Sequence, residues 1–241
     1  MAAKQSASPL APAGNAPTTA RTAPQLAIRR LVAAVLYVVA GICAGLAAAS
    51  PWWTFSGTGV SVVSVSFYPG SSYSEIVGAH GAASFYTYAS HTDLAGLANL
   101  YEGALALTLV VLILALVLGA LAVMASFGGL VRLSRSNVMR NVSLLALLLA
   151  LVSVIVVPIL QPGLITGCAS SGASICGAFW GSTNASGEST TWGGSGGWEL
   201  AIAATVLLVA AWVVWRSSRH EVWGREPTTS TMPPEVPPGA A

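Results

Sequence analysis

The sequence predicts a mainly α-helical integral membrane protein: a four-helix transmembrane bundle with a small extracytoplasmic β-sheet formed by its outer loops. Three observations predict this fold class. The 241-residue chain is 54% hydrophobic and only 7% charged, with a mean hydropathy of +0.72, whereas a soluble domain carries about 25% charged residues. Four long apolar runs contain no charged residue. All ten Lys and Arg residues lie in alternate segments between these runs, which indicates one cytoplasmic side.

The four apolar runs predict helices over about residues 31–49, 104–125, 142–160 and 198–215. A helix rises about 1.5 Å per residue, so about 20 residues cross the hydrocarbon layer of about 30 Å. The fourth run reaches this length because Trp198 and Trp215 suit the two membrane interfaces. The two ends of the chain are rich in Ala, Pro, Ser and Thr and are predicted to be disordered cytoplasmic tails, 1–26 and 223–241, flanking a membrane domain over 27–222.

The positions of the charges predict the orientation. The ten cations occupy the segments before the first run, between the second and third, and after the fourth: Lys4, Arg21, Arg29, Arg30, Arg132, Arg135, Arg140, Arg216, Arg219 and Arg225. Five of the eight acidic residues lie in or beside the two other loops: Glu75, Asp93, Glu102, Glu188 and Glu199. Because Lys and Arg are retained in the cytoplasm, we expect a multi-pass protein of the plasma membrane with both termini cytoplasmic.

An alternative reading concerns the first run. Residues 47–49 are three alanines before Ser50, which resembles the cleavage site of a secretory signal peptide. The run is longer than the usual apolar core of about 7–15 residues, and 30 residues precede it. We therefore expect a retained first helix.

The first outer loop, residues 50–103, opens with a proline and two tryptophans directly after the first predicted helix. A proline stops a helix, and indole rings favour the membrane interface. Aromatic residues are also enriched in protein interfaces, where charges are depleted. The predicted outer-face contact residues are therefore Trp52, Trp53, Phe55 and Phe67.

A strand is predicted over residues 60–67, where β-branched residues nearly alternate with serine between two glycine-containing turns. A second apolar and aromatic stretch, 82–88, could pair with it. Thr92 and Asp93 resemble a helix start that continues into the second helix. The exposed edges of such a sheet would pair with another chain or be covered by the second outer loop.

The second outer loop, residues 161–197, holds two of the three cysteines, Cys168 and Cys176, with seven residues between them. Cysteines on the outer face tend to oxidise, so we expect a disulfide between them, worth about 2–3 kcal/mol by loop closure. The rest of this loop is rich in Gly, Ser, Thr and Trp, and Asn184 begins a glycosylation acceptor sequence.

Candidate chemistry in the outer loops is sparse. His80, His91 and Asp93 carry groups that bind zinc or copper, but their spacing is wider than that of an ordinary zinc site. Glu102 and Glu199 could converge as a carboxylate pair, although each is accounted for by the positive end of a helix dipole. We therefore predict no catalytic residue, no metal site and no cofactor.

The residues of the helices do not favour a thiol oxidoreductase or a channel. Membrane thiol oxidoreductases with four helices need a reactive Cys-x-x-Cys pair, which is absent, and Cys43 lies in an apolar setting that keeps a thiol inert. A channel or transporter usually carries ionisable residues within the membrane, and these runs have none. Pro158 indicates a kink near the outer end of the third helix.

Small residues one helical turn apart favour close packing of the helices. Gly41 and Gly45 form such a pair in the first helix, and Ala115 and Gly119 form one in the second. A third pair, Ala146 and Ala150, lies in the third helix. These positions are the predicted helix-packing residues of a bundle.

The tetraspan plan and the Pro51-Trp52-Trp53 step after the first helix resemble the claudins and related proteins. The claudin first loop carries Gly-Leu-Trp and two cysteines, and residues 50–103 contain neither. The Tyr-, Gly- and Ser-rich first loop is closer to that of the MARVEL-type junction proteins. The resemblance implies adhesion, paracellular or scaffolding function through the outer loops, without catalysis.

The sequence thus predicts a non-enzymatic membrane protein that acts through its extracytoplasmic loops as a structural, adhesion or complex-accessory subunit. Its expected partners are the lipid bilayer and other membrane proteins, or a second copy of the chain, and not nucleic acid. The alternative function is a transporter or channel component, or a subunit of a membrane enzyme complex.

Overall fold

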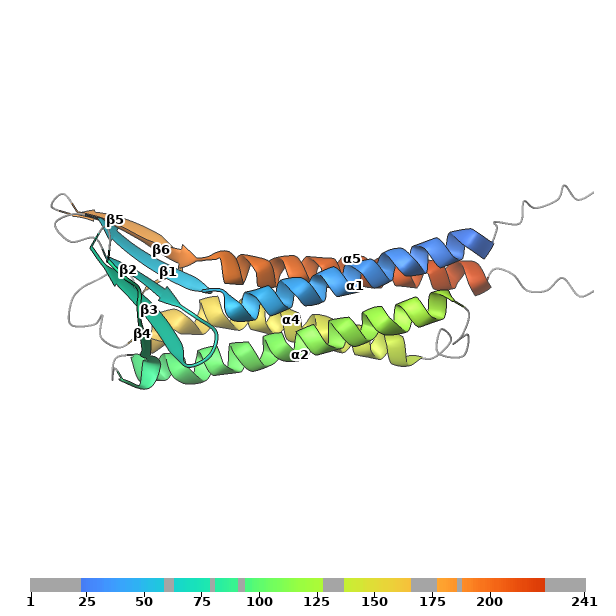
Figure 1. Ribbon diagram of the computed structural model, residues 1–241, viewed down its shortest axis with the longest axis horizontal. Helices are drawn as coiled ribbons and strands as arrows, with labels where there is room; N and C mark the ends of the chain where they lie inside the picture. The colour runs from blue at the N-terminus through green and yellow to red at the C-terminus, as the bar shows by residue number, and fades with distance from the viewer. Residues whose placement is uncertain are drawn as a thin grey trace, which may run out of the picture.

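Four long helices form a bundle, and a twisted β-sheet extends from one end of it (Figure 1). The computed structural model describes residues 23–58, 63–78, 81–90, 94–127, 137–165, 177–185 and 188–223. The ends of the described chain, at the start of the first helix and the end of the last, both lie at the end of the bundle away from the sheet (Figure 1). The sheet and the chain ends are therefore at opposite poles of an elongated molecule.

The helices are longer than the apolar runs that predict them. Their bounds are α1 Ala23–Ala49, α2 Ala95–Ser126, α4 Asn137–Leu164 and α5 Gly196–Trp223. Each is long and apolar enough to cross a membrane. The first two turns of α2, before residue 104, are amphipathic, because Leu97 and Tyr101 are buried while Asn99 and Glu102 are exposed. This extension lies beyond the apolar run and underlies the sheet, which hydropathy alone does not predict.

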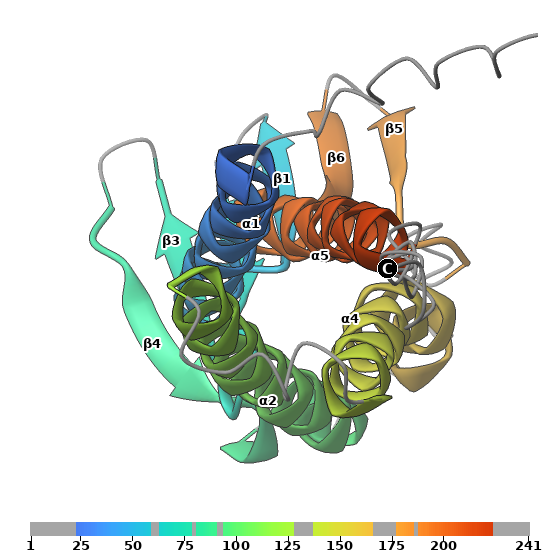
Figure 2. The same ribbon diagram turned by 90° about the vertical axis from the view of Figure 1, so that its right-hand side faces the viewer.

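The helices form a ring in the order α1, α2, α4, α5 (Figure 2). The interior of the ring is built largely from alanine, which lets the backbones approach closely. The buried alanines are Ala33, Ala34, Ala40, Ala44, Ala115, Ala122, Ala125, Ala146, Ala150, Ala204 and Ala211. This core is narrow and has no large aromatic side chain except Tyr37 and Trp215.

The four predicted packing residues of the first two helices lie where α1 meets α2. A Cβ added to Gly41 would lie 3.2 Å from Leu116, and one added to Gly119 would lie 2.9 Å from Val38. Gly45 faces Leu112 of α2, and Ala115 is fully buried. Because no side chain separates the backbones at these positions, α1 and α2 are in close contact over several turns.

Six antiparallel strands form one sheet in the order β4-β3-β2-β1-β6-β5. Their bounds are β1 Trp53–Thr58, β2 Val63–Phe67, β3 Ser72–Val77, β4 Ser84–Thr87, β5 Gly181–Ala185 and β6 Glu188–Gly194. A short 3₁₀ helix, η1 Tyr88–Ser90, follows β4. The predicted strand over 60–67 is observed as β2 in its described part. Four strands come from the first loop and two from the second.

The expected pairing of the 82–88 stretch with the strand predicted over residues 60–67 is wrong. β4, which lies in that stretch, pairs with β3, and β3 lies between β4 and β2. The physical reason is the turn after β2, where Gly70 has a positive φ of 108° and reverses the chain directly into β3. The amide of Gly70 donates to the Tyr101 carbonyl at 2.8 Å, which ties this turn to α2.

The second loop covers one edge of the first-loop strands, as one of the two sequence-based alternatives expected. β6 pairs with β1 from Trp53 opposite Gly194 to Thr58 opposite Ser189. β1 follows α1 after a three-residue link, and β6 leads almost directly into α5. The neighbouring strands β1 and β6 are therefore continuous with two helices that pack against each other.

Candidate functional site

Tryptophan side chains join the sheet to the bundle. Four of them donate the indole N–H to a backbone carbonyl: Trp52 to Ala47 at 2.8 Å, Trp53 to Phe179 at 2.8 Å, Trp192 to Ala178 at 3.0 Å and Trp198 to Val154 at 3.1 Å. A buried indole N–H that finds such a partner avoids the cost of an unpaired donor. The junction is thus both apolar and satisfied in hydrogen bonds, which makes it rigid.

The predicted outer-face contact residues are corrected by this junction. Trp52, Trp53 and Phe67 are 0%, 1% and 5% exposed and belong to the core between the sheet and the helices. Phe55 is half-buried against the same core. These rings are buried because the sheet lies over the helix ends. Their indole N–H groups donate to backbone carbonyls, whereas at a membrane interface they would bond to water.

Pro158 explains one of the indole contacts. A proline inside a helix has no N–H for the carbonyl four residues earlier, here that of Val154. The indole of Trp198 donates to this freed carbonyl. α4 continues through Pro158 and also through Pro162, which the sequence reading did not single out, and ends at Leu164.

A stack of aromatic rings fills the junction below β2 and β3. The Phe67 ring is stacked on those of Tyr73, Tyr88 and Tyr101, with centroids 5.7, 5.8 and 6.3 Å apart. The Tyr88 hydroxyl donates to the Tyr68 carbonyl at 2.8 Å. Burial raises the pKa of Tyr88 well above its usual range, and burial together with the Glu75 carboxylate raises the pKa of Tyr73. Both hydroxyls therefore stay neutral over the physiological range.

The register gives the sheet two chemically different faces. Trp53, Phe55, Val65, Phe67 and Tyr73 are on the face that packs toward the helices, since each is paired with another of them or lies two residues from one. The opposite face carries Ile76, Phe85 and Asn184 but is otherwise mostly Ser and Thr: Thr54, Ser56, Thr58, Ser64, Ser66, Ser72, Ser74, Thr87, Ser182, Ser189 and Thr191. This hydroxyl face is the reason for the serine alternation seen in the sequence.

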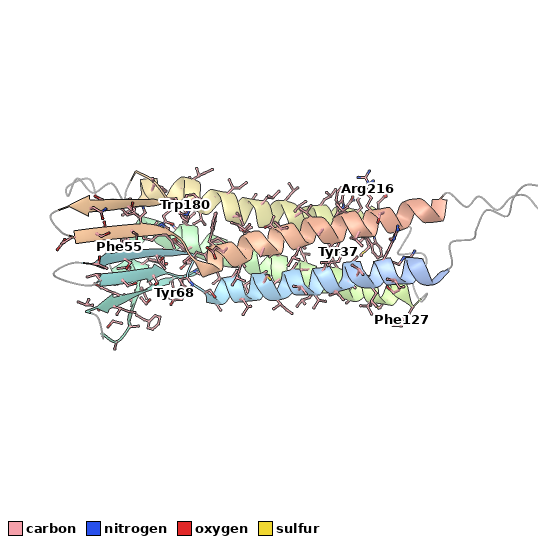
Figure 3. All side chains as sticks on the ribbon, turned by 90° about the horizontal axis from the view of Figure 1, so that it is seen from above. Tyr37, Phe55, Tyr68, Phe127, Trp180 and Arg216 are labelled. Carbon is pink, nitrogen blue, oxygen red and sulfur yellow. The ribbon has the colours of Figure 1, made fainter. Side chains whose placement is uncertain are left out.

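Both ends of the sheet are open edges. All four residues of β4 are exposed, and Phe85 and Tyr86 on it are 67% and 40% exposed. Val77, at the end of the neighbouring β3, is 59% exposed. Trp180, beside the other edge strand β5, is 51% exposed (Figure 3). The exposed large side chains of the sheet are thus at its two edges, and β4 carries no Lys or Pro to block pairing.

A shallow cavity of about 270 Å³ lies beneath the sheet. Its walls are apolar and aromatic side chains from β1, β2 and β3, together with Leu94 and Ile165 at the helix ends. Glu75 is the one ionisable carboxylate among the described residues of its lining. The cavity shows that the sheet bridges the helix ends without packing flat on them.

The described carboxylates and cations occupy opposite poles. Glu75, Glu102, Glu188 and Glu199 lie toward the sheet, whereas Arg29, Arg30, Arg140 and Arg216 lie toward the other end. Arg216 is labelled at that end, beside the Trp212 ring, whose centroid is 5.4 Å from its guanidinium (Figure 3). Arg30 donates to the Ala125 carbonyl in the last turn of α2 at 3.1 Å, which complements the negative end of that helix.

The helix-dipole explanation holds for Glu199 but not for Glu102. Glu199 is in the first turn of α5, whereas α2 has no acidic residue in its first turn, because it begins at Ala95. The two carboxylates are exposed on α2 and α5, which are not neighbours in the ring (Figure 2). The structure does not bring them together as a pair.

Several predicted residues lie outside the described part of the chain. These are both cysteines of the expected disulfide, Cys168 and Cys176, and the metal candidates His80, His91 and Asp93. Within the described residues no group of three or more metal-ligating side chains occurs. Cys43 is a free, half-buried thiol against the bundle core. Asn184 is exposed on β5.

Two buried hydrogen bonds across the bundle were not predicted. The Tyr37 hydroxyl of α1 is 3.0 Å from Ser143 Oγ of α4, and the Tyr101 hydroxyl of α2 donates to Gln161 Oε1 of α4 at 2.7 Å. The side chains of Tyr37, shown in the middle of the bundle in Figure 3, and Tyr101 are fully buried. The sequence signal that could have indicated them is a polar side chain inside or directly beside an apolar helical run, as for Tyr37 within 31–49 and Gln161 just after 142–160.

Replacing Tyr101 by phenylalanine is expected to lower the free energy of unfolding by about 1–3 kcal/mol, because the Gln161 side chain, 1% exposed, keeps its polar atoms but loses its partner. The double variant Tyr101→Phe, Gln161→Leu should recover part of this loss, since it removes both polar groups. Urea-induced unfolding in detergent, followed by circular dichroism, measures both values. Equal stability of Tyr101→Phe and wild type would contradict the assignment.

No protein-family model matches the chain, and no curated protein matches it. The described sheet end carries hydroxyls, aromatic rings and carboxylates, and its Ser and Thr hydroxyls have no histidine beside them in the described residues that would activate a nucleophile.

Proposed function

We propose that this chain is an integral protein of the plasma membrane, with four crossings, both termini in the cytoplasm and the sheet on the outer face. The four apolar helices support insertion. The orientation is supported by the described arginines, which lie toward the pole away from the sheet, because positively charged segments stay in the cytoplasm. The exposed apolar residues along the helices, such as Leu148, Ile155 and Val206, would face lipid tails.

We further propose that the protein is a non-enzymatic structural, adhesion or complex-accessory subunit that binds a protein partner through the β4 edge of its sheet. The observation that carries this function is the open β4 edge with Phe85 67% exposed on it. An unpaired strand edge offers a row of backbone donors and acceptors to an incoming strand, and exposed aromatic rings supply contact area. The rigid tryptophan junction would hold this edge in a fixed position.

The resemblance to claudin and MARVEL-type tetraspan proteins supports the same proposal of partner binding through the outer loops. It implies that the partner is another membrane protein or a second copy of the chain, reached through the outer loops. The strand-rich first loop is consistent with that plan. A Cys168–Cys176 disulfide, which lies outside the described residues, stays a prediction.

The alternative function, a transporter, a channel or part of a membrane enzyme, has less support. The interior of the described bundle is filled largely by alanine. Several hydroxyls buried in the helices bond within their own helix, as for Thr108 with the Ala104 carbonyl and Thr205 with the Ala201 carbonyl. A conduit would need ionisable or hydrated groups along the axis.

Site-specific cross-linking tests the β4 edge. A photoreactive residue at Ser84, which is exposed on β4, is expected to give a defined adduct in native membranes. Phe85→Lys should weaken that adduct about tenfold or more, since it removes an aromatic contact and adds an edge charge. Trp180→Lys, at the other edge, is the matched control and should leave it unchanged. A chain that gives no adduct, purifies as a monomer and turns over a substrate would refute the proposal.

A further inference from the structure

A cleft of about 480 Å³ opens on the side of the bundle between α2 and α4, in the half nearer the sheet. Its walls are apolar, with Asn99 and Ser153 as the polar side chains among the residues that line it. The Ser153 hydroxyl is already bonded to the Ala150 carbonyl at 2.8 Å. A volume in this range suits a small organic ligand, so the cleft is large enough to hold part of a lipid molecule.

Small residues produce this cleft. Gly96, Gly103 and Ala104 are on the α2 side, and a Cβ added to Gly103 would have no neighbour within 4 Å. At the sheet end the two helices touch, because the Leu164 carbonyl lies 3.3 Å from the position of a Cβ on Gly96. The cleft is therefore closed toward the sheet and open toward the side of the bundle, where the lipids would lie.

The cleft crosses the expected boundary of the hydrocarbon layer, where the polar headgroup of a lipid meets its acyl chains. The apolar run of α2 begins at Ala104, so Asn99 and Gly103 lie above the expected hydrocarbon boundary and Leu107 lies below it. On α4, the lining from Ser153 to Leu160 covers about 10 Å of the hydrocarbon layer at about 1.5 Å per residue. A ligand lying along the cleft would place a chain between the helices and a headgroup near Asn99.

The charges at the mouth of the cleft select among headgroups. Glu102 is exposed and does not line the cleft, but it is three residues from Asn99 and therefore flanks the cleft on the Asn99 side. Every Lys and Arg of the sequence lies in segments 1–30, 132–140 and 216–225, and the described ones, Arg29, Arg30, Arg140 and Arg216, lie at the other pole. An anionic headgroup would find a carboxylate and no guanidinium or ammonium group here, whereas an amine-bearing headgroup would be attracted to Glu102.

We propose that the α2–α4 cleft is a binding site for one phospholipid with a zwitterionic, amine-bearing headgroup. The acyl chain lies between Gly103 and Ser153, and the headgroup lies beside Asn99 and Glu102. The inference rests on the proposed membrane insertion and orientation and adds a ligand to them. It does not depend on the partner of the β4 edge.

Native mass spectrometry of the full chain, purified in mild detergent and supplied with defined phospholipids, tests this site. Wild type is expected to retain one phosphatidylethanolamine molecule. Gly103→Leu should lose that mass shift, because the Cβ at this position has open space around it and the longer side chain would fill the cleft. Gly163→Leu is the matched control: it is also a helical glycine with nothing within 4 Å, it does not line the cleft, and it should retain the lipid.

Competition between lipids tests the headgroup. Wild type should retain phosphatidylethanolamine in preference to phosphatidylglycerol, and Glu102→Lys should reverse that preference. Equal lipid retention by Gly103→Leu and wild type, a preference of wild type for phosphatidylglycerol, or conversion of a dimer to a monomer by Gly103→Leu would each overturn the proposal. Cross-linking from Ser84 in the Gly103→Leu variant reports partner binding separately. If that adduct is unchanged, a change in lipid retention is not caused by loss of the partner.

Discussion

Replacement of Trp53 by alanine is expected to lower the free energy of unfolding by about 3–5 kcal/mol and to detach the sheet from the bundle. Trp53 is 1% exposed, its ring centroid lies 5.1 Å from that of Phe67, and its indole donates to the Phe179 carbonyl. The substitution removes a large buried ring and leaves that carbonyl without its partner. It therefore acts on both loops together, since Trp53 is on β1 and Phe179 precedes β5.

The matched control for Trp53→Ala is Trp180→Ala in the same sheet. Trp180 is 51% exposed, so its loss should change stability by about 1 kcal/mol or less. Limited proteolysis of the sheet and urea-induced unfolding monitored by circular dichroism report the two effects. Similar losses in both variants would show that the sheet depends on total aromatic content and not on the buried junction.

Substituting Gly197 by alanine is expected to cost about 3 kcal/mol, because the added methyl group meets backbone that cannot move aside. A Cβ there would lie 2.5 Å from the Ser50 carbonyl oxygen and 2.6 Å from that of Pro51. The amide of Gly197 also donates to the Pro51 carbonyl at 2.8 Å. The substitution would push apart the end of α1 and the start of α5 at the base of the sheet.

Gly196 provides the control for Gly197, since it is the adjacent residue in the same first turn of α5. It is exposed, and a Cβ added to it would have no neighbour within 4 Å. Gly196→Ala should be neutral or stabilise the helix by up to about 1 kcal/mol. The thermal midpoints of the two variants in the same detergent give the comparison. Equal midpoints would contradict the close approach of α1 and α5 at Gly197.

The helices could be predicted from the sequence because hydropathy is a property of each segment alone. The runs without charge near residues 31–49, 104–125, 142–160 and 200–215 all lie within observed helices. The ends of the helices could not be predicted in this way. The extra turns of α2, for example, are stabilised by burial of Leu97 and Tyr101 against the sheet. That burial depends on a partner element that no local pattern reveals.

The sheet was predicted only where its alternation is strong. β2 alternates valine with serine, but β6 is Glu-Ser-Thr-Thr-Trp-Gly-Gly and reads as a polar loop. It is a strand because it pairs with β1, from more than 130 residues earlier in the chain. The burial of the tryptophans could not be predicted either, because it depends on partners that are distant in the sequence. The indole of Trp53, for example, donates to the Phe179 carbonyl of the other loop.

The continuity of β1 with α1 and of β6 with α5 has a mechanical consequence. A partner that pulls on the sheet loads β1 and β6 together, and these strands pass the load along α1 and α5, which are packed side by side. Both of these helices run to the pole of the bundle away from the sheet, where the described chain begins and ends (Figure 1). The molecule would thus bear tension along its long axis through this pair of helices, and a load on the β4 edge would also reach α2, because β4 is followed in the chain by η1 and α2.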